Sequence, residues 1–267
     1  MNVHPSKAFR LLSLLPTRPV EFYDRLMTVV EVNRERGLSA SKRTNSVTFM
    51  EALCRALDVP TGDVAKILAE SQLGDIEKTV LKGIAATRTA GPFDRDHNGD
   101  FALARSLYAI CRLRSPNAVL ETGVAYGVSS AFMLQAMEVN QKGTLFSVDL
   151  PPLGKDADQH VGELVPELLR KRWHLHRGTA KRILPDLLPS IGELDLFIHD
   201  SLHTSRNMTF EFETVWPCLR PGAVLISDDV GLNDAFSDFA AKIKPAYAAT
   251  IQEENKEAWF GIMVKPS

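Results

Sequence analysis

Residues 118–130 read Ala-Val-Leu-Glu-Thr-Gly-Val-Ala-Tyr-Gly-Val-Ser-Ser, and no other stretch says as much about the architecture of the chain. The apolar, strand-like run from Ala118 to Leu120 leads through the acidic Glu121 into a turn that contains Gly123 and Gly127. Glycines at such positions let the backbone turn sharply and approach a ligand closely. The free amides of the first turn of the following helix then point at that ligand. The stretch therefore predicts a strand, a glycine turn and a helix that grip a nucleotide-like cofactor.

The residue types at this turn distinguish between cofactors. A dinucleotide-binding turn has the pattern Gly-x-Gly-x-x-Gly, whereas Ala125 and Val128 stand at the second and third glycine positions here. Such a turn would hold a pyrophosphate poorly, and the carboxylate of Glu121 would repel it. The same carboxylate suits a cationic amino-acid ligand, such as the methionyl part of S-adenosylmethionine. The alternative, in which the glycines serve only a tight strand-to-helix turn, stays open at this point.

A second acid follows at the end of the next strand-like run. Asp149 stands near the end of residues 143–150, after the helix expected over residues 128–140. A carboxylate at this place can accept hydrogen bonds from both hydroxyls of a ribose. It lies further from Gly123 than the roughly 20 residues of a dinucleotide fold, a difference that a longer helix can absorb. The alternative is an acid that only caps a loop.

Length and composition set limits on the class of protein. The chain has 267 residues, of which 45% are hydrophobic and 24% charged, as in an ordinary globular protein with ample material for a core. Its length predicts one domain of about 175 residues with an extension. The formal net charge of -2 gives no general electrostatic reason to bind nucleic acid or an acidic membrane surface. We therefore expect neither as a partner.

The cysteines and the N-terminus indicate the cellular compartment. Cys54, Cys111 and Cys218 are odd in number and widely separated, which favours reduced thiols over a disulfide or a metal site. The N-terminal residues lack the apolar region of a signal peptide. No stretch approaches the roughly 18 apolar residues that a membrane span requires. We expect a cytoplasmic protein.

The first 90 residues contain helical patterns and no chemical motif. Apolar residues recur at helical spacing on three faces, which are Met50, Leu53, Cys54 and Leu57; Val64, Ile67 and Leu68; and Ile76, Val80, Leu81 and Ile84. We predict a helical N-terminal extension over residues 1–90, for packing, for dimerisation as a possible homodimer, or as a lid over an acceptor pocket. A second domain is predicted over residues 91–267, opening with a polar linker in which Asp100 caps a helix at 101–113.

From residue 118 onward, strands and helices alternate with short connections. Helices are expected at 128–140, 161–172, 179–188, 205–219 and 233–243, with strands at 194–200 and 223–229. Such alternation is typical of a parallel sheet covered on both faces. The last two strand-like runs, 246–253 and 258–265, have no helix between them and must pair antiparallel. The predicted fold is α/β, a doubly wound seven-stranded and mostly parallel sheet that ends in an antiparallel hairpin.

Four motifs stand in a fixed order along this sheet. They read Glu121-Thr-Gly-Val-Ala-Tyr-Gly-Val-Ser, Ser147-Val-Asp-Leu-Pro-Pro, Phe197-Ile-His-Asp-Ser-Leu-His-Thr and Leu225-Ile-Ser-Asp-Asp-Val. Together with the terminal hairpin, they resemble the class I S-adenosylmethionine-dependent methyltransferases. Within that class they are most similar to the branch related to catechol O-methyltransferases and to metal-dependent macrolide and sugar O-methyltransferases. The resemblance covers about residues 91–265.

The resemblance implies a set of contacts to S-adenosylmethionine. It assigns Glu121, Gly123 and Ser129 to the methionine end, Asp149 to the ribose, and Thr179 and Ala180 to the surroundings of the adenine. The predicted cofactor-binding set also includes Tyr126, Gly127, Leu150 and Asp200.

Three further acids suggest a metal site. Asp200 ends one strand, and Asp228 and Asp229 end the next, so their side chains should open on the same crevice as the cofactor. Unpaired carboxylates would repel each other, and a divalent cation with oxygen ligands compensates for this. Catechol-type relatives hold magnesium with acids matching Asp200 and Asp228 and an amide matching Asp229, and sugar-methylating relatives have an acid at that third position. The alternative is that Asp228 and Asp229 cap the following turn through Gly231 and that Asp200 bonds to backbone amides.

His203 lies three residues beyond Asp200, where catechol-type relatives place a lysine that takes the proton of the acceptor. An imidazole can do this near neutral pH, so we predict His203 and Asp200 as catalytic residues. A surface or packed histidine is the alternative. His199 points to the opposite face of its strand and is expected to satisfy a hydrogen bond in the core.

The predicted function is an S-adenosylmethionine-dependent O-methyltransferase that acts on a small hydroxylated molecule with the help of Mg²⁺ or another divalent cation. Residues 151–160 are expected to form a flap over the site, although an ordinary solvated loop is an alternative. Two other functions stay open. One is a metal-independent methyltransferase of the same fold acting on nitrogen or carbon, and the other is a catalytically silent module that binds the cofactor. The sequence does not identify the acceptor.

Overall fold

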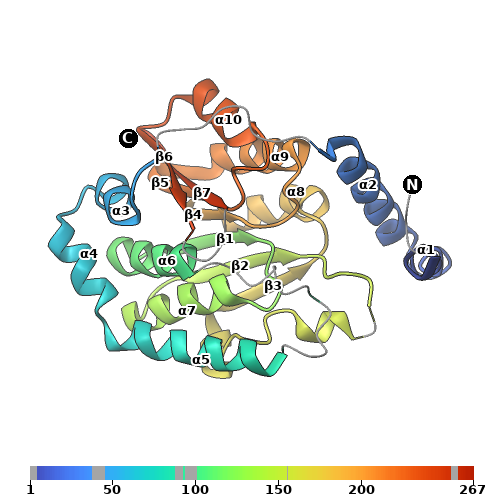
Figure 1. Cartoon of the computed structure of the whole chain (residues 1–267), viewed down its shortest axis with the longest axis horizontal. Helices are drawn as coiled ribbons and strands as arrows, with labels where there is room; N and C mark the ends of the chain where they lie inside the picture. The colour runs from blue at the N-terminus through green and yellow to red at the C-terminus, as the bar shows by residue number, and fades with distance from the viewer. Residues whose placement is uncertain (1–4, 38–45, 88–92, 94–100, 155, 254–257) are drawn as a thin grey trace.

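The computed structural model describes residues 5–37, 46–87, 93, 101–154, 156–253 and 258–267. Its helices are α1 Pro5–Leu12, α2 Pro19–Glu35, α3 Phe49–Leu57, α4 Thr61–Leu68, α5 Ser71–Thr87, α6 Phe101–Arg114, α7 Val128–Asn140, α8 Ala180–Ile191, α9 Ser205–Val215 and α10 Ala235–Ile243 (Figure 1). Its strands are β1 Ala118–Thr122, β2 Thr144–Asp149, β3 Trp173–Arg177, β4 Leu194–His199, β5 Leu219–Ser227, β6 Tyr247–Gln252 and β7 Trp259–Val264. Short 3-10 turns cover Ala157–His160, Glu167–Arg172 and Trp216–Cys218.

The strands form one seven-stranded sheet in the order β3-β2-β1-β4-β5-β7-β6. The strands from β3 to β5 pair in parallel, and β7 pairs antiparallel with both β5 and β6. The predicted fold class is therefore confirmed, including the terminal hairpin. After β1 the chain proceeds outward to β2 and β3 and then returns to β4 on the other side of β1. In doubly wound sheets the ligand-binding crevice lies at such a reversal, which here is at the carboxyl ends of β1 and β4.

Alternation along the strands gives each face of the sheet its own core. In β4, Leu196 and Ile198 join the cluster under α3 to α7, whereas Phe197 joins the cluster under α8 to α10. Successive side chains of a strand point to opposite faces, so a strand covered on both faces must be apolar at nearly every position. Figure 1 shows α5, α6 and α7 on one side of the sheet and α9 and α10 on the other.

The helices of the first 90 residues fall into two groups. Helices α3 to α5 share the core of the sheet, since Leu53, Val64 and Val80 are buried in the same cluster as residues of α6 and α7. Neither hydrophobic cluster includes a described residue of α1 or α2, and Phe9 and Tyr23 are exposed. Figure 1 shows α1 and α2 to the side of the sheet. The domain boundary at residue 90 and the role of this extension stay predictions.

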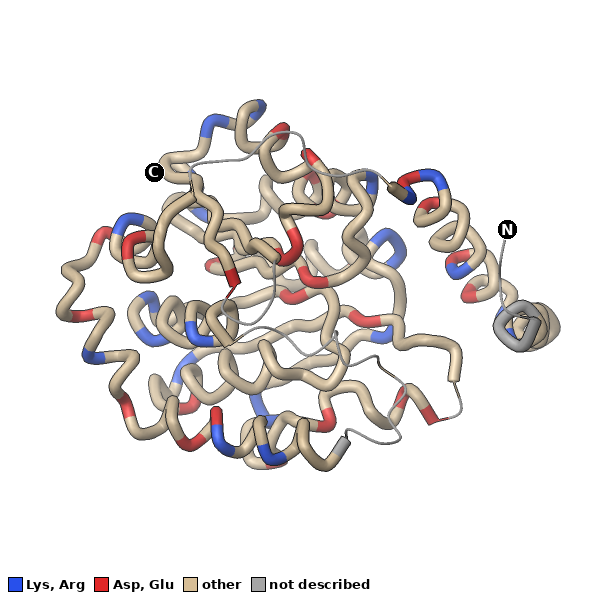
Figure 2. The backbone as a smooth tube through the Cα atoms, viewed as in Figure 1, with Lys and Arg blue, Asp and Glu red and all other residues tan. Residues whose placement is uncertain are grey.

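Helix α2 is attached to the domain by polar contacts. Arg177, at the end of β3, donates to Glu21 at 2.8 Å, and Lys181 and Arg182 of α8 bind Glu31 and Asp24, both at 2.6 Å. Figure 2 shows basic and acidic positions interspersed over the chain, in keeping with the small net charge. No helix in the described part of the chain combines the length and apolar character needed to cross a bilayer.

The helix predicted over residues 161–172 is wrong. The structure has turns there, followed by the 3-10 turn Glu167–Arg172. Gly162 has φ +68°, and a Cβ on it would lie 2.1 Å from the ring of Trp173. Pro166 also lacks the amide hydrogen that a helix interior needs. The segment instead docks on the glycine turn, because Gly162 N–H donates to the carbonyl of Ala125 and Leu164 N–H to that of Tyr126, both at 2.9 Å. The predicted cap Asp100 lies outside the described residues.

Candidate functional site

The glycine turn after β1 has the predicted sharp bend, and the bend is imposed by the chain itself. Gly123 has φ +85°, and a Cβ there would lie 1.8 Å from the carbonyl oxygen of Asp200. Gly127 has φ +87°, and its Cβ would lie 2.9 Å from the Cα of Gly162. Residues that carry a side chain rarely adopt a positive φ, and neither position has room for a Cβ atom. Both glycines are therefore required by packing against backbone, while their contact with a ligand stays a prediction.

Glu121 lies fully buried at the end of β1. Its Oε2 accepts hydrogen bonds from Ser130 Oγ at 2.6 Å and from Ser147 Oγ at 2.7 Å, and Ser147 Oγ accepts one from the indole of Trp173 at 2.9 Å. Its Oε1 is buried without a hydrogen-bond partner. Burial raises the pKa of Glu121 to about 7, against the opposing effect of the two serines. One oxygen of this carboxylate can therefore still accept a hydrogen bond from a ligand.

Asp149 has the same incomplete bonding at the end of β2. Its carboxylate accepts hydrogen bonds from the backbone amides of Ala125 and Leu150, whereas Oδ2 is buried without a partner. Burial raises the pKa of Asp149 to about 6, although these amides and the charges of Arg25 and Arg177 lower it. Two neighbouring strands, β1 and β2, thus each carry near their ends a carboxylate with one unsatisfied oxygen.

The residues predicted near the adenine lie beside Asp149. Gly178 N–H donates to the carbonyl of Asp149 at 2.8 Å, which holds the start of α8 at the end of β2. Thr179 is the N-cap residue of α8 and Ala180 its first residue, and no side-chain cap bond forms there. The structure therefore brings the predicted ribose and adenine positions to one edge of the sheet.

Two other predicted cofactor residues are largely inside the protein. Tyr126 is 3% exposed and contacts Phe93 edge-on, with ring centroids 4.9 Å apart. Ser129, in the first turn of α7, is 6% exposed. Their burial leaves the backbone of the turn as the part that a ligand can reach most easily.

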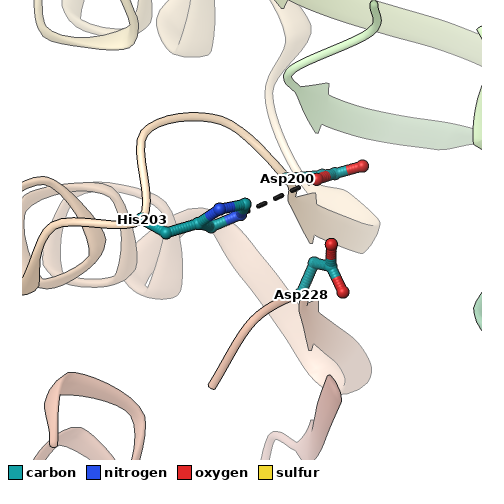
Figure 3. A group of neighbouring side chains, drawn as sticks. All are labelled: Asp200, His203 and Asp228. Atoms are coloured by element: carbon teal, nitrogen blue, oxygen red, sulfur yellow. Dashed lines mark ion pairs between the residues drawn. The ribbon is translucent and has the colours of Figure 1, made fainter. Parts of the chain in front are cut away.

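The acids at the ends of β4 and β5 converge as predicted, but in two groups. Ligand atoms of Asp200, His203 and Asp228 lie within 4.8 Å of one another, and so do those of Asp228, Asp229 and Glu253. Figure 3 shows Asp200 and Asp228 on neighbouring strand ends, with His203 on the loop that follows β4. Asp228 belongs to both groups, whereas Asp200 falls in the first and Asp229 in the second.

Glu253 is a candidate residue that sequence reasoning missed. It directly follows β6 and is 5% exposed. Strand β7 inserts between β5 and β6, and this folds the hairpin so that Glu253 lies beside Asp228 and Asp229. No motif marks Glu253, because only the antiparallel insertion of β7 brings it to the site.

The first acidic group is electrostatically strained and suits a cation. Burial raises the pKa of Asp200 well above its usual range, and the charge and hydrogen bond of Asp228 and the charges of Glu121 and Asp229 raise it further. Asp228 is 5% exposed, and its Oδ1 has no hydrogen-bond partner. These carboxylates fit a divalent cation, with Mg²⁺ suiting the oxygen ligands and a transition metal suiting a site that includes the imidazole.

His203 is held between acids. Its Nδ1 lies 3.1 Å from Asp229 Oδ2, and its Nε2 lies 3.7 Å from Asp200 Oδ1. Burial lowers the pKa of His203, but the hydrogen bond to Asp229 and the charges of Asp228, Asp229 and Glu211 outweigh it and raise the pKa overall. The side chain is 19% exposed, but its Nε2 is buried without a hydrogen-bond partner, so the imidazole can exchange a proton only with a group that reaches this nitrogen.

His199 satisfies a core hydrogen bond, as expected from its position in β4. It is fully buried, and its Nδ1 lies 2.6 Å from Oε2 of Glu211 in α9. Glu211 is a second residue that sequence reasoning missed, because a single glutamate in an amphipathic helix is usually solvent-exposed.

The comparison with protein families bears on this geometry. Residues 120–230, which run from β1 to just beyond β5, match the model of a family described as a methyltransferase domain. This part of the chain is similar to a methyltransferase domain. The match covers the four motifs that carry the resemblance, and the sheet topology is that of the class I methyltransferase fold. No curated protein matches the chain.

Solved structures with this fold include several methyltransferases. The chain is 18% identical to an O-methyltransferase from Bacillus cereus in complex with SAH, covering 73% of this chain and 91% of that one with a TM-score of 0.56. It is 17% identical to the O-methyltransferase TomG from Streptomyces achromogenes, in complex with SAM, over 91% of this chain and 99% of that one with a TM-score of 0.51. It is 17% identical to the SAH-bound methyltransferase PaMTH1 from Podospora anserina, over 70% and 88%, also with a TM-score of 0.51. At these identities the likeness supports the fold.

Proposed function

We propose that this methyltransferase is an S-adenosylmethionine-dependent O-methyltransferase that acts on a hydroxyl of a small molecule. The observation that carries the proposal is the pair of buried, unsatisfied carboxylate oxygens, Glu121 Oε1 and Asp149 Oδ2, on the neighbouring strands β1 and β2. A bound nucleoside with a cationic amino-acid tail would supply donors to both. The Bacillus cereus and Streptomyces achromogenes O-methyltransferases, which have the same fold and carry SAH and SAM, support this choice of donor.

In this proposal, Glu121 binds the amino end of the donor, Asp149 binds its ribose hydroxyls, and the loop at Thr179 and Ala180 borders its adenine. When bound, the donor supplies an electrophilic methyl group on a sulfonium centre. The chain must then hold the acceptor oxygen in line with that methyl group, which is a problem of positioning. The backbone of the turn between Gly123 and Gly127 fixes the donor on one side of the crevice.

The acceptor side is assigned to His203 and the acids. His203 takes the proton of the acceptor hydroxyl, and Asp229, 3.1 Å from its Nδ1, orients the ring so that Nε2 faces Asp200 and the crevice. Asp200, Asp228 and Asp229 are the proposed ligands of a divalent cation, with Mg²⁺ preferred. Asp228 is the central ligand, because it shares one group of ligand atoms with Asp200 and the other with Asp229. Such a cation, held by these residues, would lower the pKa of the acceptor hydroxyl. His203 then needs to be only a modest base.

Other features of the proposal concern the setting of the enzyme. We assign it to the cytoplasm, with a small hydroxylated acceptor and with neither nucleic acid nor membrane as a partner. Residues 1–90 are assigned to packing, to a homodimer contact or to a lid.

Calorimetry with S-adenosylhomocysteine tests the donor assignment. We expect binding by the wild-type protein and a loss of roughly tenfold to a hundredfold in affinity for Asp149→Ala, which removes hydrogen bonds to a charged group. Asp186→Ala is the matched control, because Asp186 is exposed on α8 and should not alter binding. Failure of the wild-type protein to bind either S-adenosylmethionine or S-adenosylhomocysteine would refute the proposed donor.

Incubation with labelled donor and cell extracts, followed by mass spectrometry, tests the reaction. We expect a small hydroxylated compound to gain the mass of one methylene group, with activity lost on chelation and restored by Mg²⁺. Turnover that is insensitive to chelators, on nitrogen or carbon, would favour a metal-independent methyltransferase. Donor binding without transfer to any compound would favour a silent module.

A further inference from the structure

Glu211 of α9 is a fully buried carboxylate whose two oxygens are both bonded. Its Oε2 accepts from Thr122 Oγ1 at 2.5 Å and lies 2.6 Å from His199 Nδ1. Its Oε1 accepts from Ser201 Oγ at 2.7 Å and from Asn207 Nδ2 at 2.8 Å. These partners come from the ends of β1 and β4, from the loop after β4 and from α9 itself. One buried side chain thus ties together the elements that border the crevice.

The partners of Glu211 favour its ionised form. Burial raises its pKa, but the charge and hydrogen bond of His199 and the hydroxyls of Thr122 and Ser201 outweigh it, so that the pKa is lowered overall. Burying an ionised carboxylate costs several kcal/mol, and apolar side chains of similar volume often give equal or greater stability. The buried charge is therefore a poor means of stabilising the sheet. The benefit that can account for a buried carboxylate here is that it holds the neighbouring side chains in one defined arrangement.

The arranged segment carries the proposed catalytic residues. Glu211 binds His199 and Ser201 at the start of the loop between β4 and α9 and Asn207 just beyond its end. Asn207 also donates to the carbonyl of Leu202 at 3.0 Å. Asp200 and His203 lie between these positions in the chain, and Figure 3 shows their side chains close to each other and to Asp228.

His199 transmits this restraint to His203. The two rings pack edge-on, with centroids 5.4 Å apart at an interplanar angle of 79°. Phe212 packs against His199 in the same manner at 5.5 Å. On its other side, His203 Nδ1 meets Asp229 Oδ2 at 3.1 Å. The ring of His203 therefore lies between Asp229 and the ring of His199, and Glu211 fixes the orientation of His199.

We propose that Glu211 is a positioning residue for His203, acting through the ring of His199 and through the loop that carries Asp200. The role assigned to His203 rests on the proposed function, whereas the structural coupling of Glu211 to the His203 ring does not. Misplacement of a catalytic group by about 1 Å can cost roughly a hundredfold in rate. Loss of the Glu211 charge is thus expected to lower kcat and to leave the affinity for S-adenosylhomocysteine unchanged, because Glu211 contacts neither Glu121 nor Asp149.

Nuclear magnetic resonance of histidine-labelled protein tests the coupling without an acceptor. The chain has 7 histidines, and the His203 ring signals are those lost in His203→Gln. We expect a nuclear Overhauser effect between the ring protons of His199 and His203 in the wild-type protein. In Glu211→Gln this effect is expected to disappear, and the His203 signal is expected to shift or split into several. Glu213→Gln is the matched control, because Glu213 lies on the same helix, is exposed and pairs with Lys242 at 2.6 Å.

An unchanged contact between the two rings in folded Glu211→Gln would overturn the proposal. Folding is verified by a cooperative thermal transition and by calorimetry with S-adenosylhomocysteine. If Glu211→Gln does not fold, Glu211→Asp is the second variant. Its side chain keeps the carboxylate but is shorter by one methylene group, and we expect the contact between the rings of His199 and His203 to be lost there too. Preserved contact in that variant would overturn the proposal equally.

Turnover separates this proposal from the proposed function. With an acceptor identified in extracts, we expect Glu211→Gln to lower kcat about tenfold to a hundredfold with an unchanged KM. A loss of donor affinity equal to the loss of kcat would indicate a purely structural role and contradict the proposal. Absence of methyl transfer by the wild-type protein would refute the proposed function, and the contact between the two rings would still test the coupling.

Discussion

Glu121 offers the sharpest test of the donor site, because replacing it should have opposite effects on stability and on binding. The residue is fully buried, and burial raises its pKa to about 7 from an ordinary 4.5. Glu121→Gln keeps the shape of the side chain and an oxygen that can accept from Ser130 and Ser147. It removes the charge that the folded protein accommodates poorly without a ligand.

The magnitude follows from the raised pKa. The unfolded chain releases the Glu121 proton near pH 4.5 and the folded chain only near pH 7, so the wild-type protein loses stability as pH rises between these values. A shift from 4.5 to about 7 corresponds to about 3 kcal/mol in total. Between pH 5 and pH 8, the Glu121→Gln variant should therefore gain about 2 to 3 kcal/mol relative to the wild-type protein. In thermal unfolding this is a relative gain of roughly 5 to 10 °C.

The assay is chemical denaturation of both proteins from pH 5 to pH 8, together with calorimetry with S-adenosylhomocysteine. We expect the stability difference to grow with pH and the affinity for S-adenosylhomocysteine to fall roughly tenfold or more in the variant. Glu167→Gln, at a residue whose side chain is 91% exposed, should change stability by no more than about 0.5 kcal/mol at any pH. A stability difference that stays the same at pH 5 and pH 8 would refute the reasoning about burial.

Three further predictions concern other parts of the molecule. Glu21→Gln should speed hydrogen exchange of the α2 amides about tenfold or more, because this carboxylate, whose pKa is lowered to about 2, links α2 to the domain; unchanged exchange would contradict this. Gly127→Ala should destabilise the protein by about 2 to 4 kcal/mol in urea denaturation, because residue 127 has a positive φ and its Cβ would collide with Gly162. Gly62→Ala is the control and should cause no such loss, because the space around Gly62 is open. Asp228→Asn should raise the melting temperature of the metal-free protein, because it removes a charge that repels Asp200. It should also abolish any stabilisation by Mg²⁺, and stabilisation by Mg²⁺ equal to that of the wild-type protein would argue against Asp228 as a ligand.

Much of the fold could be predicted from local pattern. The strands β1 and β4 are short apolar runs, α7 follows directly from the glycine turn, and the absence of a helix between the last two strands requires an antiparallel pair. Each of these features depends on residues close together in the sequence. The helix predicted over 161–172 was wrong because Gly162 is placed by its contact with Trp173, a tertiary contact that periodicity does not report.

The candidate site was predictable only where its residues end strands. Asp149, Asp200 and Asp228 each follow an apolar run, and parallel strands bring their carboxyl ends to one edge. Glu211 and Glu253 have no such signal, since the first lies on a helix and the second follows the edge strand β6. The sequence likewise shows that Asp228 and Asp229 are adjacent. It does not show that Asp228 belongs to both groups of ligand atoms and Asp229 to only one of them.

The amino-acid sequence alone specified which strands would form, where the chain would turn and which acids would stand at the edge of the sheet. These properties follow from hydrophobic period, from glycine and from chain order, all of which act over a few residues. Only the tertiary structure decided which carboxylate oxygens are left without partners and which imidazole is wedged against another. Burial and pairing depend on side chains contributed by distant segments: α7 and β2 supply the serines that bond to Glu121, and α9 supplies the carboxylate that fixes His199.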